Sequence, residues 1–296
     1  MANAFTSMSN TVLARAIFEA FLVKIAPLTR FARNFSADIV GEKGDKVRVP
    51  FVPASDSAKD FTGTYTVGSL SAQGKEVTLD GHKYVDWALT DTEFHNNAQL
   101  TLEMFAAQKA NKLAQAVLSD IWSIITVANF SNEIEVTAAN FDSDEVADLR
   151  EDATVLNWPE DLRTLILSPA DMTGLLKDAD IKSALNFGSS DPIQKGTIPQ
   201  LSGFGLMESN LIPANAENLR SFAVYPDAIL LAMRYLAPQE GHSYTEAMPF
   251  TDPESGITLG FRAWYDPNTG TKKNILECNW GKLLGNPASL IRIQTP

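Results

Sequence analysis

The sequence predicts an α+β fold in which an N-terminal arm and a long β-hairpin precede one very long helix and a half of alternating strands and helices. Three observations predict it. Alternating apolar and polar residues mark two strands on either side of a segment rich in Gly, Ser and Thr. An apolar stripe of helical spacing then continues for about 37 residues. Beyond residue 140, short strands alternate with short helices.

Size and charge exclude several classes of protein. The 296 residues allow one large or two modest domains, at ~150 residues per domain. The formal net charge of −12 disfavours a surface that grips nucleic acid or anionic lipid. The longest apolar run, Ala228–Met233, is far too short to cross a bilayer. We therefore expect neither avid nucleic-acid binding nor a membrane partner.

The first element is an amphipathic helix. Between Thr11 and Ala26 the apolar residues recur three and four positions apart, and Pro27 closes the pattern. This helix is the main structured part of the predicted N-terminal arm, residues 1–40.

The next segment, residues 41–89, reads as a long β-hairpin. Val47, Val49 and Phe51 alternate with polar residues, and a second strand over 77–89 contains Gly81, which indicates a bulge or bend. A lone two-stranded hairpin is marginal in water, so another surface must cover its apolar face. That surface belongs either to a second subunit or to the hairpin's own domain, and the periodicity leaves both open.

A helix start follows the hairpin. Thr90 and Glu93 form a capping-box pattern, and neither Gly nor Pro occurs from there to Ala128. The spacing predicts a helix up to ~55 Å long. A rod of this length suits a flat, elongated subunit better than a compact enzyme domain.

The C-terminal half alternates between short strands and short helices. Asp142–Glu145 predicts a cap before a helix over 146–155, and Ser168-Pro169 predicts a helix start directly after the strand Leu165–Leu167. The remaining predicted elements are helices over 181–187 and 228–234, and strands over 203–208, 219–225, 257–265, 273–278 and 290–293.

No residue pattern indicates catalysis, a metal or a cofactor. Cys278 is the single cysteine, which excludes an intrachain disulfide and a thiolate metal cluster. His82, His95 and His242 share no helical spacing that would build a metal site or a catalytic base with its partner. We expect no enzyme activity and no cofactor. An α/β enzyme whose catalytic groups meet only in space remains an alternative.

The order of parts resembles the major capsid protein of tailed bacteriophages, which has the Hong Kong phage 97-type shell fold. The residues that carry the resemblance are Gly41–Val49 entering the hairpin and Tyr84–Glu93 leaving it. Leu165–Leu176 is similar to the family's axial strand-helix unit, and Leu201–Asn210 to the strand that follows its loop. The resemblance spans nearly the whole chain, and its force comes from the order of the parts.

The resemblance implies a division of the chain. The N-terminal arm, 1–40, precedes an extended hairpin loop, 41–89, that reaches over a neighbouring subunit. A peripheral domain with the spine helix, 90–161, leads to an axial domain, 162–265. The last segment, 266–296, returns to the peripheral domain.

The resemblance also implies a structural function. Copies would assemble as hexamers and pentamers into an icosahedral or prolate head that encloses double-stranded DNA without binding it specifically. Scaffolding, portal and decoration proteins are further expected partners. Assembly would occur in the bacterial host cytoplasm, and the protein would reside in the virion capsid. An encapsulin-type nanocompartment shell is the alternative within the fold.

The predicted inter-subunit residues all lie in the hairpin, where apolar side chains follow even spacing. They are Phe61, Tyr65, Val67, Lys75, Val77 and Leu79. Some family members crosslink a hairpin lysine to a neighbouring asparagine, but nothing in the sequence marks Lys59 or Lys75 for that reaction.

Overall fold

The structure, a computed structural model, is mixed α and β. It describes residues 10–25, 27–36, 46–51, 60–63, 65, 73–92, 100–179, 181, 198–241, 243–253 and 255–296. Its helices are α1 (Asn10–Ile25), α2 (Leu28–Phe31), α4 (Leu100–Trp122), α5 (Ser143–Val155), α6 (Pro169–Lys177) and the 3-10 turn η3 (Pro287–Ser289). The first strands are β1 (Ala32–Asn34), β2 (Lys46–Phe51), β3 (Gln73–Thr78), β4 (Gly81–Thr90), β5 (Glu133–Glu135), β6 (Thr164–Leu167) and β7 (Gln200–Leu201). The others are β8 (Phe204–Glu208), β9 (Leu219–Val224), β10 (Ile229–Met233), β11 (Glu246–Thr251), β12 (Thr258–Asp266), β13 (Thr271–Leu284) and β14 (Leu290–Gln294).

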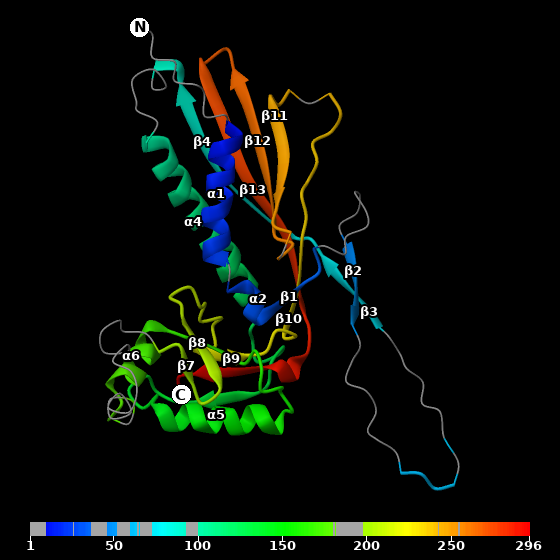
Figure 1. The fold of residues 1–296 in the computed structure, drawn as a ribbon, viewed down its shortest axis with the longest axis vertical. Coiled ribbons are helices and arrows are strands. Elements are labelled where there is room, and N and C mark those ends of the chain that lie inside the picture. The colour runs from blue at the N-terminus through cyan, green and yellow to red at the C-terminus, as the bar shows by residue number, and fades with distance from the viewer. Residues whose placement is uncertain are drawn as a thin grey trace.

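A long sheet dominates one end of the molecule (Figure 1). Its order is β1-β10-β13-β12-β11, and β4 also pairs with β13. The two long helices α1 and α4 pack together along this sheet. Phe21 of α1, Val117 of α4 and Leu276 of β13 are buried in the core between them. The sheet and the two helices therefore form one elongated layer pair.

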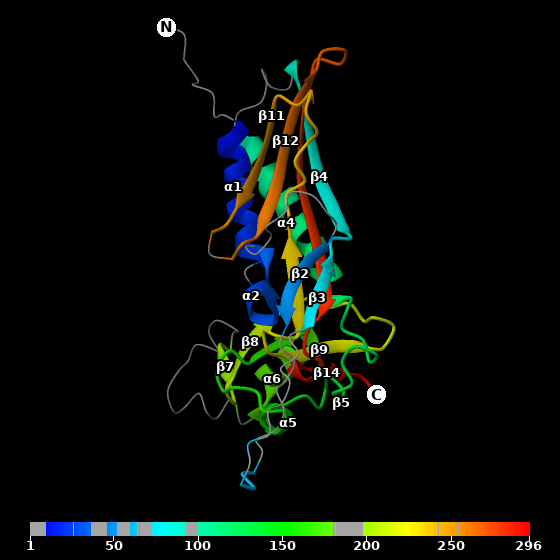
Figure 2. The ribbon, with the colours of Figure 1, turned by 90° about the vertical axis from the view of Figure 1, so that its right-hand side faces the viewer.

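A second sheet lies crosswise at the other end (Figures 1 and 2). Its order is β5-β14-β9-β6-β8-β7, and α5 and α6 pack on it. Phe141, Leu149 and Ile291 are buried in this second core. The main core also contains Phe222 of β9 and Leu290 of β14, so the apolar packing continues from one sheet to the other.

Most local predictions are confirmed, because they rest on short-range signals. Helix α1 has the predicted bounds to within one residue. Asp142 and Glu145 form the predicted capping box of α5. The Ser168 side chain caps α6, with Pro169 in its first turn. The predicted helix over 181–187 lies almost wholly outside the described residues.

One predicted helix is wrong: residues 229–233 form strand β10. All five of its side chains are buried, and the strand lies between β1 and β13 in the long sheet. A short, continuous apolar run has no periodicity to separate a buried strand from a buried helix. Pairing with distant strands decides the conformation here.

The long helix ends earlier than predicted. Helix α4 ends at Trp122 instead of Ala128. The Asn215 side chain donates hydrogen bonds to the carbonyl oxygens of Trp122 at 3.2 Å and Ile125 at 2.6 Å. These bonds satisfy carbonyl groups that a continuing helix would have used. Part of the predicted capping box, Thr90–Glu93, lies outside the described residues.

The sheets divide the chain differently from the predicted domains. Strand β4, which was assigned to the hairpin 41–89, pairs with β13 in the long sheet. From the segment 162–265, strands β10, β11 and β12 also belong to the long sheet. From 266–296, strand β14 belongs to the crosswise sheet. The chain crosses between the two sheets more often than predicted, because strand pairing is non-local and leaves no mark in local sequence.

Gly281 is predicted to be required for the packing of the hairpin on the long sheet. A Cβ atom at this position would lie 2.2 Å from the Thr78 carbonyl oxygen. Gly281→Ala is expected to lower the free energy of unfolding by about 1–3 kcal/mol, the usual cost of overpacking. Chemical denaturation measures the change. Gly74→Ala is the control, since no atom lies within 4 Å of its added Cβ. Equal losses in both variants would contradict the prediction.

Candidate assembly surface

The base of the hairpin folds onto its own chain. Strands β2 and β3 pair antiparallel from Lys46↔Thr78 to Phe51↔Gln73. Val49 and Val77 are buried in a small core that also contains Leu230 of β10. Of the two surfaces that could cover the hairpin's apolar face, the subunit's own sheet therefore covers it at the base.

Lys75 fastens the hairpin to the end of β13. Its Nζ donates hydrogen bonds to the carbonyl oxygens of Leu284 at 2.9 Å and Gly285 at 2.8 Å. Partial burial lowers the pKa of this ammonium group. The Lys75 side chain thus binds its own subunit, and its contact with a neighbouring subunit stays a prediction.

The outer face of the hairpin base is polar. The Arg48 guanidinium lies 3.2 Å from the Glu76 carboxylate, and the Lys46 ammonium lies 3.3 Å from it. Hydrogen bonds from Arg48 and then Lys46 lower the pKa of Glu76. Because these side chains are exposed, they keep the solvent face charged and add little to stability.

Two aromatic side chains remain exposed near the tip of the hairpin. Phe61 is 62% and Tyr65 is 85% exposed, and their ring centroids lie 4.7 Å apart. Residues 60–63 lie at one end of the molecule, beyond the other described elements (Figures 1 and 2). This aromatic pair makes the tip an exposed apolar feature of the described chain.

Five of the six predicted contact residues lie in the described part of the chain. Val77 is buried in its own chain, Leu79 packs beside it, and Lys75 binds carbonyl groups of the same chain. Their contacts with a neighbouring subunit stay predictions. Phe61 and Tyr65 are exposed, and Val67 lies outside the described residues. Period-two spacing identifies an apolar face, but it carries no information about which surface covers that face.

The buried carboxylate of Asp171 is part of a polar network. It accepts hydrogen bonds from the Ser168 and Ser221 hydroxyls, the first at 2.8 Å. It also lies 2.7 Å from the Arg220 guanidinium. The network joins the start of α6 to β9, which holds the helix on the crosswise sheet.

A second buried network surrounds Arg292 in β14. Its Nε donates to the Phe130 carbonyl oxygen at 2.8 Å, and its guanidinium pairs with Glu217 at 3.1 Å and with Glu133. A buried charge requires such partners, because an unpaired one is strongly destabilising. Arg292 thus joins the crosswise sheet to the chain that leaves α4.

Of the candidate chemistry-bearing residues, the structure describes Cys278 and His82, which lie on the paired strands β13 and β4. Cys278 is buried, and burial raises the pKa of its thiol. His82 Nε2 lies 3.2 Å from a Glu277 carboxylate oxygen, while His95 and His242 lie outside the described residues. In the described part of the chain, no three His, Cys, Asp or Glu side chains gather as a metal site would require. No described helix is long and apolar enough to cross a membrane.

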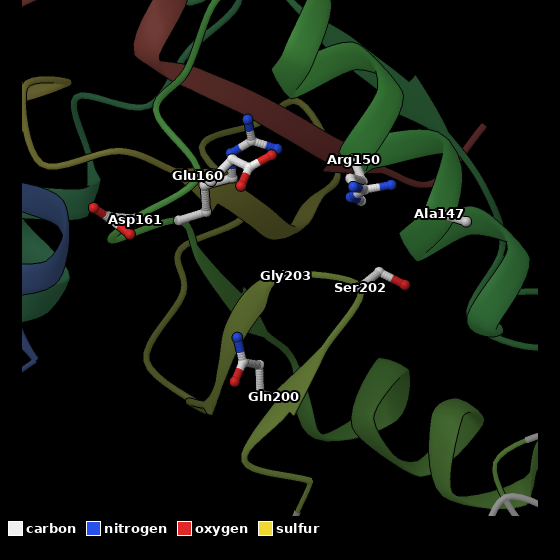
Figure 3. Close-up of a pocket in the computed structure, with 8 residues that line it drawn as sticks. Ala147, Arg150, Glu160, Asp161, Gln200, Ser202 and Gly203 are labelled. Atoms are coloured by element: carbon white, nitrogen blue, oxygen red, sulfur yellow. The ribbon is translucent and has the colours of Figure 1, made fainter.

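A hollow of about 520 Å³ opens on the crosswise-sheet unit (Figure 3). Arg150 and Ala147 of α5 lie on one side of it. Glu160 and Asp161 lie on another side, and the turn between β7 and β8 completes the wall. Sequence analysis missed this surface, since its residues come from three separate segments that carry no common motif.

Comparison with solved structures identifies the fold. The chain matches a structure from Mycobacterium phage Che8 with a TM-score of 0.62 at 18% identity, over 91% of this chain and 90% of that one. It matches the capsid structure of Cyanophage P-SCSP1u with a TM-score of 0.63 at 14% identity, over 90% and 86%. It also matches a virus-like particle from Pyrococcus furiosus with a TM-score of 0.55 at 11% identity, over 95% and 97%.

No family model and no curated protein matches the sequence. The structural matches nevertheless cover about nine tenths of the chain, so the similarity concerns the whole fold. The chain has the fold of phage capsid proteins, and the fold class predicted from the order of its elements is confirmed.

Removing the Lys75 ammonium is expected to loosen the hairpin base. Lys75→Met leaves two carbonyl oxygens without their charged donor, and such bonds are each worth about 1.5–3 kcal/mol. The β3 amides should exchange with deuterium about tenfold faster or more. Lys46→Met is the control, because that side chain makes only an exposed ion pair. Equal exchange rates of the β3 amides in the two variants would show that Lys75 does not hold the hairpin base.

Cys278 is expected to be unreactive in the folded protein. Its thiol is buried and its pKa is raised, so the nucleophilic thiolate is scarce and inaccessible. A colorimetric disulfide reagent should detect no thiol in native protein and one per chain in denaturant. Rapid reaction of the native protein would contradict the observed packing around β13.

Proposed function

We propose that the protein is a major capsid protein whose copies assemble, as hexamers and pentamers, into a phage head that encloses double-stranded DNA. The observation that carries this proposal is the match of about nine tenths of the chain to capsid structures, including that of Cyanophage P-SCSP1u. Its role is structural, with no catalytic step. Scaffolding, portal and decoration proteins are its further proposed partners, and assembly takes place in the host cytoplasm.

The two sheet units correspond to the two lobes of such a subunit. The long sheet with α1 and α4 is proposed as the peripheral domain, and the crosswise sheet with α5 and α6 as the axial domain. This division replaces the linear boundaries at residues 162 and 266. The two units share the main apolar core, which also contains Phe222 and Leu290 of the crosswise sheet.

The hairpin tip is proposed as the part that contacts a neighbouring subunit. Phe61 and Tyr65 form an exposed aromatic pair on a hairpin whose base is fastened by Lys75. An aromatic side chain buries 150–250 Å² when it enters a contact, roughly the largest gain available to any residue. The surface that covers this aromatic pair is proposed to lie on a second copy of the chain.

The recurrence of phages among the matched structures and the net charge favour a phage head over an encapsulin-type shell. The TM-scores alone do not separate the two, because scores to phage structures include 0.63 and 0.52 and the Pyrococcus furiosus particle, at 0.55, lies between them. The net charge of −12 also suits a wall that contains DNA without adhering to it. An enzyme would leave the hairpin tip and the elongated shape without a role.

Replacement of the aromatic pair is expected to impair assembly and leave the subunit folded. Phe61→Ser with Tyr65→Ser removes exposed apolar area, so the melting temperature should change little. Sedimentation and electron microscopy should show particles for the wild type and mainly unassembled subunits for the double variant. Tyr84→Ser is the control, since Tyr84 is exposed on β4, which pairs with β13 and is not part of the β2–β3 pair.

Two results would overturn these claims separately. Particles formed by the double variant at wild-type yield would remove the tip from the mechanism. A wild-type protein that stays at its 32.3 kDa monomer mass under all assembly conditions would overturn the shell function itself.

A further inference from the structure

The loop between α5 and β6 holds Leu162 in an unfavourable backbone conformation with its side chain exposed. Leu162 is 68% exposed, and its φ of 64° lies in the left-handed region. That region is costly for a residue with a large side chain, and exposure of the side chain forgoes any gain from burial. Val155, at the end of α5, is a second exposed apolar residue, at 72%.

The rest of the loop holds this conformation in place. The buried Arg163 guanidinium donates to the carbonyl oxygens of Pro159 at 2.8 Å and Trp158 at 2.6 Å. Trp158 Nε1 donates to the Ala288 carbonyl oxygen at 2.6 Å, which fastens the loop to η3. Leu162 is therefore presented by a loop that hydrogen bonds hold in place, and backbone strain of this kind clusters at functional sites.

The charges beside Leu162 are separated across the hollow. Arg150 lies on the α5 side, whereas Glu160 and Asp161 lie on the loop side (Figure 3). All three residues are exposed, and no ion pair joins Arg150 to either carboxylate among the described residues. One surface thus carries a cation on one side, two anions on another and an apolar residue next to the anions.

We propose that this surface, formed by Arg150, Val155, Glu160, Asp161 and Leu162, is a contact between two copies of the chain. The charges argue for a second copy, because the acidic side of one subunit complements Arg150 of another. Leu162 and Val155 supply the apolar area that the contact buries. The inference rests on the proposed shell function and adds a second contact, remote from the hairpin tip.

Charge exchange between subunits tests the pairing. Arg150→Glu alone, and Glu160→Lys with Asp161→Lys, should each lose most of the particle yield because like charges then meet. Co-expression of the two variants should restore hexamers that neither variant forms alone. Every contact between unlike copies again joins opposite charges, and a ring of six can alternate the two copies. A purely intrachain role would not be rescued by mixing.

The strain at Leu162 supplies a second, independent test. Leu162→Gly relieves the left-handed backbone, so the melting temperature of the subunit should rise while the particle yield falls. Asn157→Gly is the matched control. Asn157 also has a positive φ, of 58°, but it presents no apolar side chain, so its replacement should leave the yield unchanged.

The outcomes separate this contact from the shell function. Wild-type particle yield in all of these variants would overturn the contact and leave the shell function standing. Failure of mixing to restore hexamers would overturn the pairing of Arg150 with the two carboxylates. A wild-type protein that never assembles would overturn the proposed function and the contact that rests on it.

Discussion

Backbone pairing along β13 is the constraint on which the rest of the subunit depends. This strand pairs with β12 over 271–277, with β4 over 271–280 and with β10 over 280–284. The Trp280 indole donates to Asp120 of α4 at 2.9 Å, and the Lys282 ammonium lies 2.9 Å from the same carboxylate. The last carbonyl groups, at Leu284 and Gly285, accept from Lys75. One strand thus positions the sheet, the long helix and the hairpin.

This arrangement separates a rigid base from exposed contact groups. The hairpin base is held by its apolar core and by Lys75, while Phe61 and Tyr65 near the tip make no contribution to the cores of the subunit. The α5–β6 loop follows the same design, because Arg163 and Trp158 hold a backbone that exposes Leu162. In both places, hydrogen bonds within the chain hold a segment that exposes apolar side chains to solvent. Contact with another copy of the chain would bury those side chains.

Local chemistry accounts for the correct sequence predictions and for their limits. The capping box at Asp142 and the Ser168-Pro169 start succeeded because each is satisfied within a few residues. The helix predicted around residues 229–233 is wrong because a fully apolar run fits either a helix or a central strand. Pairing with β1 and β13 selects the strand. The sequence carried no sign of the acceptors of Lys75 within its own chain, since the first of them lies 209 residues away in the sequence. No local pattern could have located them.

The sequence by itself determined the order of the elements, the absence of a linear catalytic motif and the resemblance to shell proteins. These follow from side-chain periodicity, capping residues and composition, which act over short distances along the chain. Only the tertiary structure decided which strands share a sheet, where α4 ends and which surfaces stay exposed. Those features depend on contacts between residues far apart in sequence, such as Asn215 with α4 and Gly281 with Thr78, and their energies exist only once the chain has folded.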